Sequence, residues 1–308
     1  MSTASHQLDI HENAPISTWF HIGGRAERLA RPMSHEDLLA CLELDDELRV
    51  LGEGANLLVD DGGVADLVVS LQQGVFVDTQ LDERTGSVYA GAGAALPGLI
   101  NRCVRSGLGG LEKLAGIPAT VGGAIIMNAG GAFGEVAQHI TRVDAIDRAG
   151  RTHSFDRAQI DFGYRQSHLN HLIITGAEFR LKPGNPDEIV QSRAECMSYK
   201  AKSQPLGEKS AGCVFKNPTL VDPIPGVGEA GERVSAGMLI DRAGLKGLSV
   251  RGASVSDVHA NFITTTPDAQ ARDVIELIQQ VRTHVEDTLG VSLHNELVIW
   301  SDRTGRPS

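Results

Sequence analysis

The stretch SAGCVFKNP, residues 210–218, places a thiol, Cys213, between a glycine and two apolar residues. Its residue type leaves four roles open: core filler, half of a disulfide, a metal ligand, or a reacting group. The reference pKa of a thiol, about 8.5, keeps it mostly protonated at neutral pH and makes it a better acid than a hydroxyl.

The positions of the other three cysteines and the lack of a secretion pattern argue against two of these roles for Cys213, those of metal ligand and of disulfide partner. The three lie at Cys41, Cys103 and Cys196, and no CxxC, CxxH or other short spacing indicates a zinc site, so we expect no metal. A disulfide is disfavoured because the chain has no pattern of secretion. Cys41 and Cys103 fall on the apolar faces of predicted helices, where core filler is the better interpretation.

Glycine-rich turns form a second candidate site. The chain has 35 glycines, many of them between Gly91 and Gly134. The turn GEGAN (52–56) and the loop GIPATVGG (116–123) can each point several backbone N–H groups at one anion, and two such loops suit a pyrophosphate. Ordinary tight turns explain either loop equally well on its own.

Well-known nucleotide and hydrolase motifs are absent or incomplete. GAGAAL (91–96) follows a predicted strand but has Leu96 where the third glycine of a dinucleotide fingerprint belongs. The sequence contains no G-x-x-x-x-G-K-[ST], H-E-x-x-H or G-x-S-x-G. P-loop, zincin and α/β-hydrolase chemistry are therefore not expected.

The elements that must position these residues alternate along the chain. Ser34 predicts the start of a helix with Asp37 at its third position, and Pro97 the first turn of a helix that Gly107 ends. Further expected elements are strands around the 52–56 turn, a hairpin over 140–156, a strand at Cys213, a surface loop over 221–233, a helix from Thr266-Pro267 to Gly290, and a last strand over 291–300.

Composition and charge limit the partners. With 308 residues, 41% hydrophobic and 22% charged, the chain is typical of a globular protein of two or three domains. A net charge of −11, without a Lys/Arg run, argues against nucleic acid or an anionic membrane as partner. No signal pattern and no stretch of about 18 apolar residues is present, so a cytoplasmic protein is expected. The sequence indicates no protein partner.

Eight motifs together resemble a known family in order and spacing. They are STWFHIGGRAERL (17–29), LGEGANLLVDDGG (51–63), GIPATVGGAIIMNAGGAFGE (116–135), DFGYRQS (161–167), GCVFKNP (212–218), AGMLIDRAGLKG (236–247), VSDVHANFI (255–263) and HNELVIW (294–300). The chain resembles the UDP-N-acetylenolpyruvoylglucosamine reductases from about residue 15 to 300. The first half alone is similar to the wider group of FAD-binding flavoproteins, and the later motifs make the match specific.

The resemblance implies a fold and a reaction. The fold is α+β: an FAD-binding flavoprotein fold of two subdomains (PCMH type), over 1–75 and 76–186, followed by a C-terminal α+β substrate-binding domain over 187–308. The turn-rich segment 182–188 supports that last boundary. The implied cofactor is FAD, with NADPH as hydride donor. Flavin N5 would pass hydride to C3 of the enolpyruvyl ether of a UDP-sugar, in peptidoglycan precursor synthesis, and C2 would take a proton.

The resemblance also implies site residues. Arg165 and Glu296 match two catalytic positions, and Cys213 stands where the family usually has a proton-donating serine. Cofactor binding is implied for Gly52, Gly54, Ala55, Asn56, Gly116, Ile117, Pro118, Thr120, Gly122, Gly123 and Asn128. Substrate binding is implied for Tyr164, Lys216, Asn217, His259 and Asn261.

Two departures from the family pattern concern the substrate. Met238 stands where many relatives carry lysine, so a phosphate contact made there must be lost or moved, and the 221–233 loop is long for a short-form member. Two other functions are compatible with the sequence: an FAD-dependent oxidase acting on another small molecule, and a non-catalytic relative that binds a nucleotide sugar.

Overall fold

The computed structural model describes residues 8–301 and divides into two compact units. The first unit combines the chain through Ala14 with Ala26–Glu53 and Ala65–Lys200; the second combines Pro15–Arg25, Gly54–Val64 and the chain from Ala201 onward. Each unit has its own buried apolar cluster. The three domains predicted from the sequence stay a prediction.

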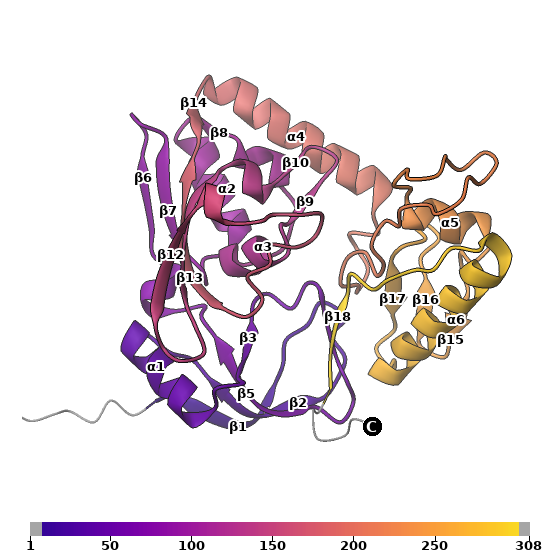
Figure 1. Cartoon of the computed structure of the whole chain (residues 1–308), viewed down its shortest axis with the longest axis horizontal. Helices are drawn as coiled ribbons and strands as arrows, with labels where there is room; N and C mark the ends of the chain where they lie inside the picture. The colour runs from indigo at the N-terminus through magenta and orange to yellow at the C-terminus, as the bar shows by residue number, and fades with distance from the viewer. Residues whose placement is uncertain (1–7, 302–308) are drawn as a thin grey trace, which may run out of the picture. The chain divides into compact units, whose positions relative to one another are not determined.

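The first unit contains four helices and two larger sheets (Figure 1). The helices are α1 (His35–Leu44), α2 (Leu96–Arg105), α3 (Val121–Ile126) and α4 (Pro186–Ser203), the last of which reaches the second unit in its final turn. An antiparallel sheet has the order β12 (Thr152–Asp156), β11 (Ile140–Ile146), β13 (Ile173–Arg180), β7 (Ser87–Gly91), β6 (Thr79–Asp82). A second sheet has the order β1 (Ile10–Pro15), β2 (Arg25–Ala30), β5 (Val64–Ser70), β3 (Arg49–Leu51). Two short pairs complete the unit: β8 (Leu108–Gly109) with β14 (Lys182–Pro183), and β9 (Gly130–Gly131) with β10 (Gly134–Glu135).

Local signals placed α1 and α2 correctly. Ser34 Oγ accepts the Asp37 N–H at 3.1 Å, and the Asp37 carboxylate accepts the Ser34 N–H at 3.1 Å, which is the reciprocal cap expected of this pair. Pro97 lies in the first turn of α2 as predicted, and Cys103 is on its buried face. The predicted hairpin is β11 paired with β12.

The second unit packs a helix on a small sheet. Strands β15 (Ser249–Val250), β16 (Ala253–Val255) and β17 (Ile263–Thr265) form the sheet, and α6 (Ala271–Leu289) packs against it beside α5 (Ala236–Arg242) (Figure 1). A further pair joins β4 (Leu57–Val59) in parallel to β18 (Val298–Trp300). The predicted face of α6 is confirmed as buried, and Gly290 ends the helix in the left-handed conformation, with φ +68°. None of the helices within residues 8–301 is long and apolar enough to span a membrane.

Three predicted boundaries in this unit were wrong. Helix α6 begins at Ala271 instead of Thr266-Pro267, because 266–269 form a turn in which the Ala269 N–H donates to Thr266 O. The last strand covers only 298–300, and Cys213 makes an isolated β-bridge where a strand was expected. Near Glu296 and near Cys213, side-chain hydrogen bonds from Asn56 and Asn261 take the place of a continuous strand pairing, as described below.

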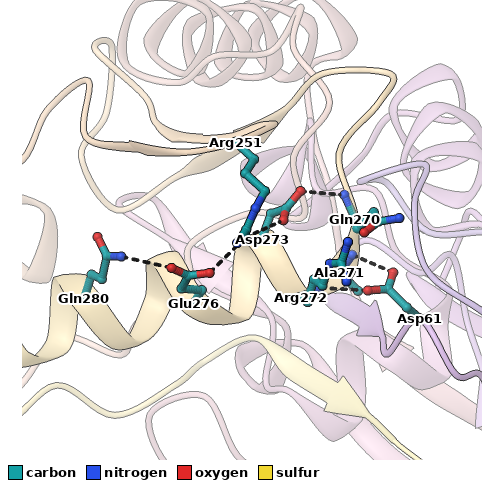
Figure 2. A network of polar contacts seen from close by, with 8 residues as sticks. All are labelled: Asp61, Arg251, Gln270, Ala271, Arg272, Asp273, Glu276 and Gln280. Carbon is teal, nitrogen blue, oxygen red and sulfur yellow. Dashed lines mark hydrogen bonds and ion pairs between the residues drawn. The ribbon is translucent and has the colours of Figure 1, made fainter.

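A polar network fixes the start of α6 (Figure 2). The two Asp61 carboxylate oxygens accept the N–H groups of Ala271 and Arg272 at 2.8 and 3.0 Å. Asp273 accepts the Gln270 N–H at 3.0 Å and pairs with Arg251 at 3.1 Å. Since the first N–H groups of a helix have no partner within it, Asp61 satisfies two of them with a full negative charge at the positive end of the helix dipole.

We expect Asp61→Ala to lower the free energy of unfolding by about 1–2 kcal/mol, the usual cost of losing a capping oxygen. Urea unfolding followed by circular dichroism measures this loss. Asp268→Asn is the matched control, because Asp268 is exposed and lies just before the same helix. Equal unfolding midpoints for Asp61→Ala and the control variant would contradict the capping role.

Candidate active site

Cys213 differs from the other three cysteines in its surroundings. All four lie in the described part of the chain and none forms a disulfide; Cys41, Cys103 and Cys196 are buried, whereas Cys213 is half-buried. Burial raises the pKa of Cys41 to about 11 and that of Cys103 to about 12, which confirms them as inert core residues. Gly212, which precedes Cys213, has φ +75°, a conformation that glycine adopts without strain.

Cys213 and Glu296 lie on neighbouring segments of the second unit. The Val214 N–H donates to Asn261 O at 2.8 Å, and the Glu296 N–H donates to Val214 O at 2.8 Å. Cys213 also forms an antiparallel bridge with Phe262. The 213–216 segment therefore runs between residues 261–262 and 294–297, which brings two of the predicted catalytic residues together.

The glycine turn 52–56 supports Glu296. Asn56 Nδ2 donates to Glu296 O at 3.0 Å, and the Val298 N–H donates to Asn56 O at 3.1 Å. Gly54 has φ +64°, and a Cβ there would lie 2.1 Å from Ser17 O, so only glycine fits. Ala55, between them, is half-buried. Asn56 thus holds the segment that carries Glu296, just before β18.

The Asn261 side chain binds the backbone of Phe215 in the way that a neighbouring β-strand would. It is 3% exposed; its Nδ2 donates to Phe215 O at 2.8 Å, and its Oδ1 accepts the Phe215 N–H at 2.9 Å. A strand neighbour would bind the same two backbone groups, which explains why Cys213 needs no continuous strand. Asn261 positions the segment that carries Cys213.

The remaining predicted substrate residues of the second unit surround the same segment. Asn217 Oδ1 accepts the Ala236 N–H at 3.0 Å, where α5 begins. Lys216 is half-buried, and its backbone N–H donates to His294 O at 2.8 Å. His259 Nδ1 accepts the Asn261 N–H at 3.2 Å. Burial lowers the pKa of His259, so the imidazole is neutral at pH 7 and serves as an acceptor.

In the first unit the structure brings the two predicted glycine loops together. A Cβ added at Gly52 would lie 2.9 Å from Thr120 Oγ1, and one at Gly122 would lie 3.0 Å from Ala92 Cβ. Both approaches are tighter than most side chains tolerate. Backbone remains accessible around this contact: Gly123 is exposed, and the 117–119 segment, with Ile117 and Pro118, is half-buried.

The N–H groups at the start of α3 do not have the predicted role. Val121 and Gly122 donate to backbone carbonyls of segment 92–94 at 2.9 and 2.8 Å, and Gly123 donates to Thr120 Oγ1 at 3.2 Å. These three groups are occupied by the protein, so they do not point at an anion. The sequence pattern shows where glycine recurs but not which N–H groups are already bonded.

Arg165 lies in a tight turn of the first unit. Gly163 and Gln166 exchange backbone hydrogen bonds of 3.0 and 3.3 Å, and Arg165 between them has φ +57°. Its guanidinium lies over the Tyr164 ring, 5.1 Å from the centroid. A non-glycine residue at positive φ costs about 1–2 kcal/mol, so this arginine is held against a local preference.

Buried polar side chains fasten that turn. Asn128 is 0% exposed; its Nδ2 donates to Gly163 O at 2.9 Å and its Oδ1 accepts the Ala137 N–H at 3.3 Å. Ser167 Oγ donates to Ile126 O at 3.1 Å. The sequence resemblance assigned Asn128 to the cofactor, and nothing in the sequence singled out Ser167. The bonds of these side chains to Gly163 and Ile126 span 35 and 41 positions, so no local pattern indicates them.

The residues present fit a bulky anionic cofactor such as FAD. Glycine-bearing, accessible backbone lies on both sides of the Gly52–Thr120 contact. The same unit supplies the cation Arg165. Within residues 8–301, no group of three or more His, Cys, Asp or Glu side chains could hold a metal ion.

Comparison with known families identifies the class. Residues 26–156 match the model of an FAD binding domain, and residues 204–300 match that of the UDP-N-acetylenolpyruvoylglucosamine reductase C-terminal domain. Together with the α+β fold and the paired site segments, these matches define a flavin-dependent oxidoreductase. The predicted fold class is confirmed.

Full-length relatives define the family. The chain is 40% identical over 292 residues to UDP-N-acetylenolpyruvoylglucosamine reductase from Synechococcus sp. (strain CC9605), with 92% of each chain covered. It is 40% identical over 306 residues to that from Moorella thermoacetica, covering 96% of this chain and 95% of the relative. The crystal structure of UDP-N-acetylenolpyruvylglucosamine reductase (MurB) from Thermus caldophilus is similar, with a TM-score of 0.79, 39% identity, and 96% and 99% of the two chains covered. The chain belongs to the UDP-N-acetylenolpyruvoylglucosamine reductase family. It is an FAD-containing, NADPH-dependent oxidoreductase.

Proposed function

We propose that this chain reduces the enolpyruvyl ether of UDP-N-acetylglucosamine to UDP-N-acetylmuramate, with Cys213 as the proton donor. The relatives' name supports the substrate. The observation that carries the chemistry is that the half-buried Cys213 and Glu296 lie on adjacent segments joined by backbone hydrogen bonds. The coarser activity, reduction in peptidoglycan precursor synthesis, follows from the family.

The net change adds one hydride and one proton across the enolpyruvyl double bond. When bound, FAD supplies the hydride, taken from NADPH, to C3. The proton at C2 comes from the chain: the Cys213 S–H bond breaks as the C2–H bond forms, and solvent then reprotonates the thiolate. A donor positioned in this way contributes typically 10²–10⁴-fold to the rate.

Charge on the reacting group needs stabilisation before the proton arrives. Negative charge builds on C2 and on the carboxylate, and Arg165 can bind a carboxylate with two parallel hydrogen bonds while remaining charged at any working pH. Glu296 orients the enol oxygen or assists protonation. Asn56 donates to the Glu296 carbonyl, and Asn128 donates to the carbonyl of Gly163, two residues before Arg165.

The other site residues bind and orient the ligands. The accessible backbone at Gly52, Gly116–Ala119 and Gly123 supports the cofactor, and Thr120 holds the Gly123 N–H in place. Asn56 and Asn128 act on the segments of Glu296 and Arg165 instead. Tyr164, Lys216, Asn217 and His259 bind the UDP-sugar, and Asn261 holds the segment that carries Lys216 and Asn217. Met238, half-buried in α5, leaves a phosphate contact to other residues.

The test is a spectrum followed by an assay. Purified chain is expected to be yellow and to oxidise NADPH when given the enolpyruvyl UDP-sugar, with UDP-N-acetylmuramate as product. Colourless protein that cannot be reconstituted with FAD would exclude the proposal. Rapid reoxidation by oxygen without response to the UDP-sugar would indicate an oxidase instead, and binding of the sugar without turnover a non-catalytic relative.

A further inference from the structure

Lys200 is a buried lysine that the reaction described above does not use. It lies on the buried face of α4 with Ile189 and Cys196, at a spacing where a helix normally places apolar residues, and it is 8% exposed. Within residues 8–301 its ammonium group has no hydrogen bond or ion pair. Burying an unpaired ammonium costs several kcal/mol, so its retention calls for a partner.

No acidic side chain raises the pKa of Lys200. Burial is the main cause that lowers its pKa, and the positive charge of Arg165 lowers it further. The one group that raises the pKa of Lys200 is the Cys196 thiol, whose own pKa burial raises, so it is neutral at pH 7. The positive charges of Lys200 and Arg165 therefore act on each other, and no acid is among the groups that raise the pKa of Lys200.

The ammonium lies beside accessible backbone. A Cβ added at Gly116 would lie 3.1 Å from Lys200 Cδ and 3.6 Å from Lys200 Nζ. Gly116 itself is exposed and has φ +78°. Lys200 thus sits against the beginning of the 116–123 loop, in the same unit as Arg165. Figure 1 shows α4 as the long helix that carries it.

We propose that Lys200 is an anion-binding residue, which together with Arg165 holds one oxyanion of a bound ligand beside Gly116. The chemistry is a phosphate or carboxylate oxygen accepting from Nζ. Three ligands of the proposed function carry such a group: FAD, the UDP-sugar and NADPH. The ligand's identity rests on the proposed function, whereas the anion site itself rests on the buried, uncompensated charge.

Lys200→Met tests the proposal, because methionine keeps most of the side-chain length and removes the charge. Lys202→Met is the matched control: it removes a lysine from the exposed face of the same helix. The full chain, freed of flavin, is unfolded in urea. Affinity for FAD is measured by quenching of flavin fluorescence, affinity for the UDP-sugar by titration of the flavin-loaded protein, and KM for NADPH by initial rates.

The expected result combines an unchanged or higher unfolding midpoint for flavin-free Lys200→Met with at least a tenfold loss of affinity for one ligand. The ligand whose affinity falls is the one that carries the oxyanion. Lys200→Arg should recover part of the affinity, since it restores the charge. Unfolding and FAD binding need no turnover, so this result is independent of whether the chain reduces the UDP-sugar.

Two outcomes would overturn the proposal. One is that all three affinities stay within twofold of those of Lys202→Met. The other is that flavin-free Lys200→Met unfolds at a clearly lower urea concentration than the control, which would show that the ammonium stabilises the chain by itself and is a structural group.

Discussion

Cys213→Ala is expected to lose reduction of the enolpyruvyl substrate while its flavin is still reduced by NADPH. A methyl group cannot release a proton to C2, and a positioned general acid typically contributes 10²–10⁴-fold. The first half-reaction uses no proton from Cys213, so its rate should stay within about twofold of wild type. The two halves of the reaction thereby separate in one variant.

Stopped-flow absorbance measures each half alone. Mixing the oxidised variant with NADPH reports loss of flavin absorbance, and mixing the reduced variant with substrate under anaerobic conditions reports its return. Since Cys213 is half-buried and lies on a segment fixed by Asn261 and Val214, loss of its sulfur should leave the backbone in place. Unchanged FAD affinity in the variant checks this.

Cys213→Ser is the matched control. A hydroxyl retains a donor of similar size at the same atom, so this variant should reoxidise its flavin with substrate, at a rate far above that of the alanine variant. Iodoacetamide should inactivate wild type and not Cys213→Ser, and bound substrate should slow the inactivation. Full turnover by Cys213→Ala would remove Cys213 from the mechanism.

Much of the fold follows from signals that act over one or two turns. The Ser34–Asp37 cap, Pro97 in the first turn of α2 and Gly290 at the end of α6 each depend on neighbours within four residues, and all three are confirmed. The start of α6 was wrong because its decisive contact is Asp61, more than two hundred residues earlier in the chain. Thr266-Pro267 favours a helix start by its residue types, but the helix begins at Ala271, where Asp61 binds the first N–H groups.

The same distinction applies to the site. Residue type and motif order single out Cys213, Arg165 and Glu296 without any coordinates. The side chains that hold them could not be predicted, because Asn261 pairs with Phe215 across 46 positions and Asn128 with Gly163 across 35. A buried amide shows no periodicity that marks which backbone group it will bind.

Asn128→Ala is expected to lower kcat/KM through Arg165, with a further cost in stability. The variant removes a donor from Gly163 O, which still accepts the Gln166 N–H, and it removes the acceptor of the buried Ala137 N–H. The buried Ala137 N–H that loses its acceptor costs about 1–3 kcal/mol, so the free energy of unfolding should fall by about that amount. The turn that holds Arg165 at positive φ then loses the Asn128–Gly163 hydrogen bond and keeps the hydrogen bond from Ser167 Oγ to Ile126 O.

The catalytic effect follows from the strain at Arg165. With φ +57° this residue keeps its position only while the surrounding structure enforces it, and relaxation of the turn moves the guanidinium. Displacement of a substrate-binding group by about 1 Å can cost on the order of 10²-fold. Steady-state kinetics with the UDP-sugar should therefore show lower kcat/KM, while the rate of flavin reduction by NADPH changes little.

A double-variant cycle separates positioning from general destabilisation. If Asn128 acts through Arg165, then adding Asn128→Ala to Arg165→Ala should lower kcat/KM no further, although the stability loss remains. Asn128→Gln, which retains the amide, should recover some activity if its longer side chain still reaches Gly163. Additive losses of kcat/KM in the double variant would show that Asn128 contributes independently of Arg165, for instance by contact with the cofactor, as the sequence alone had suggested.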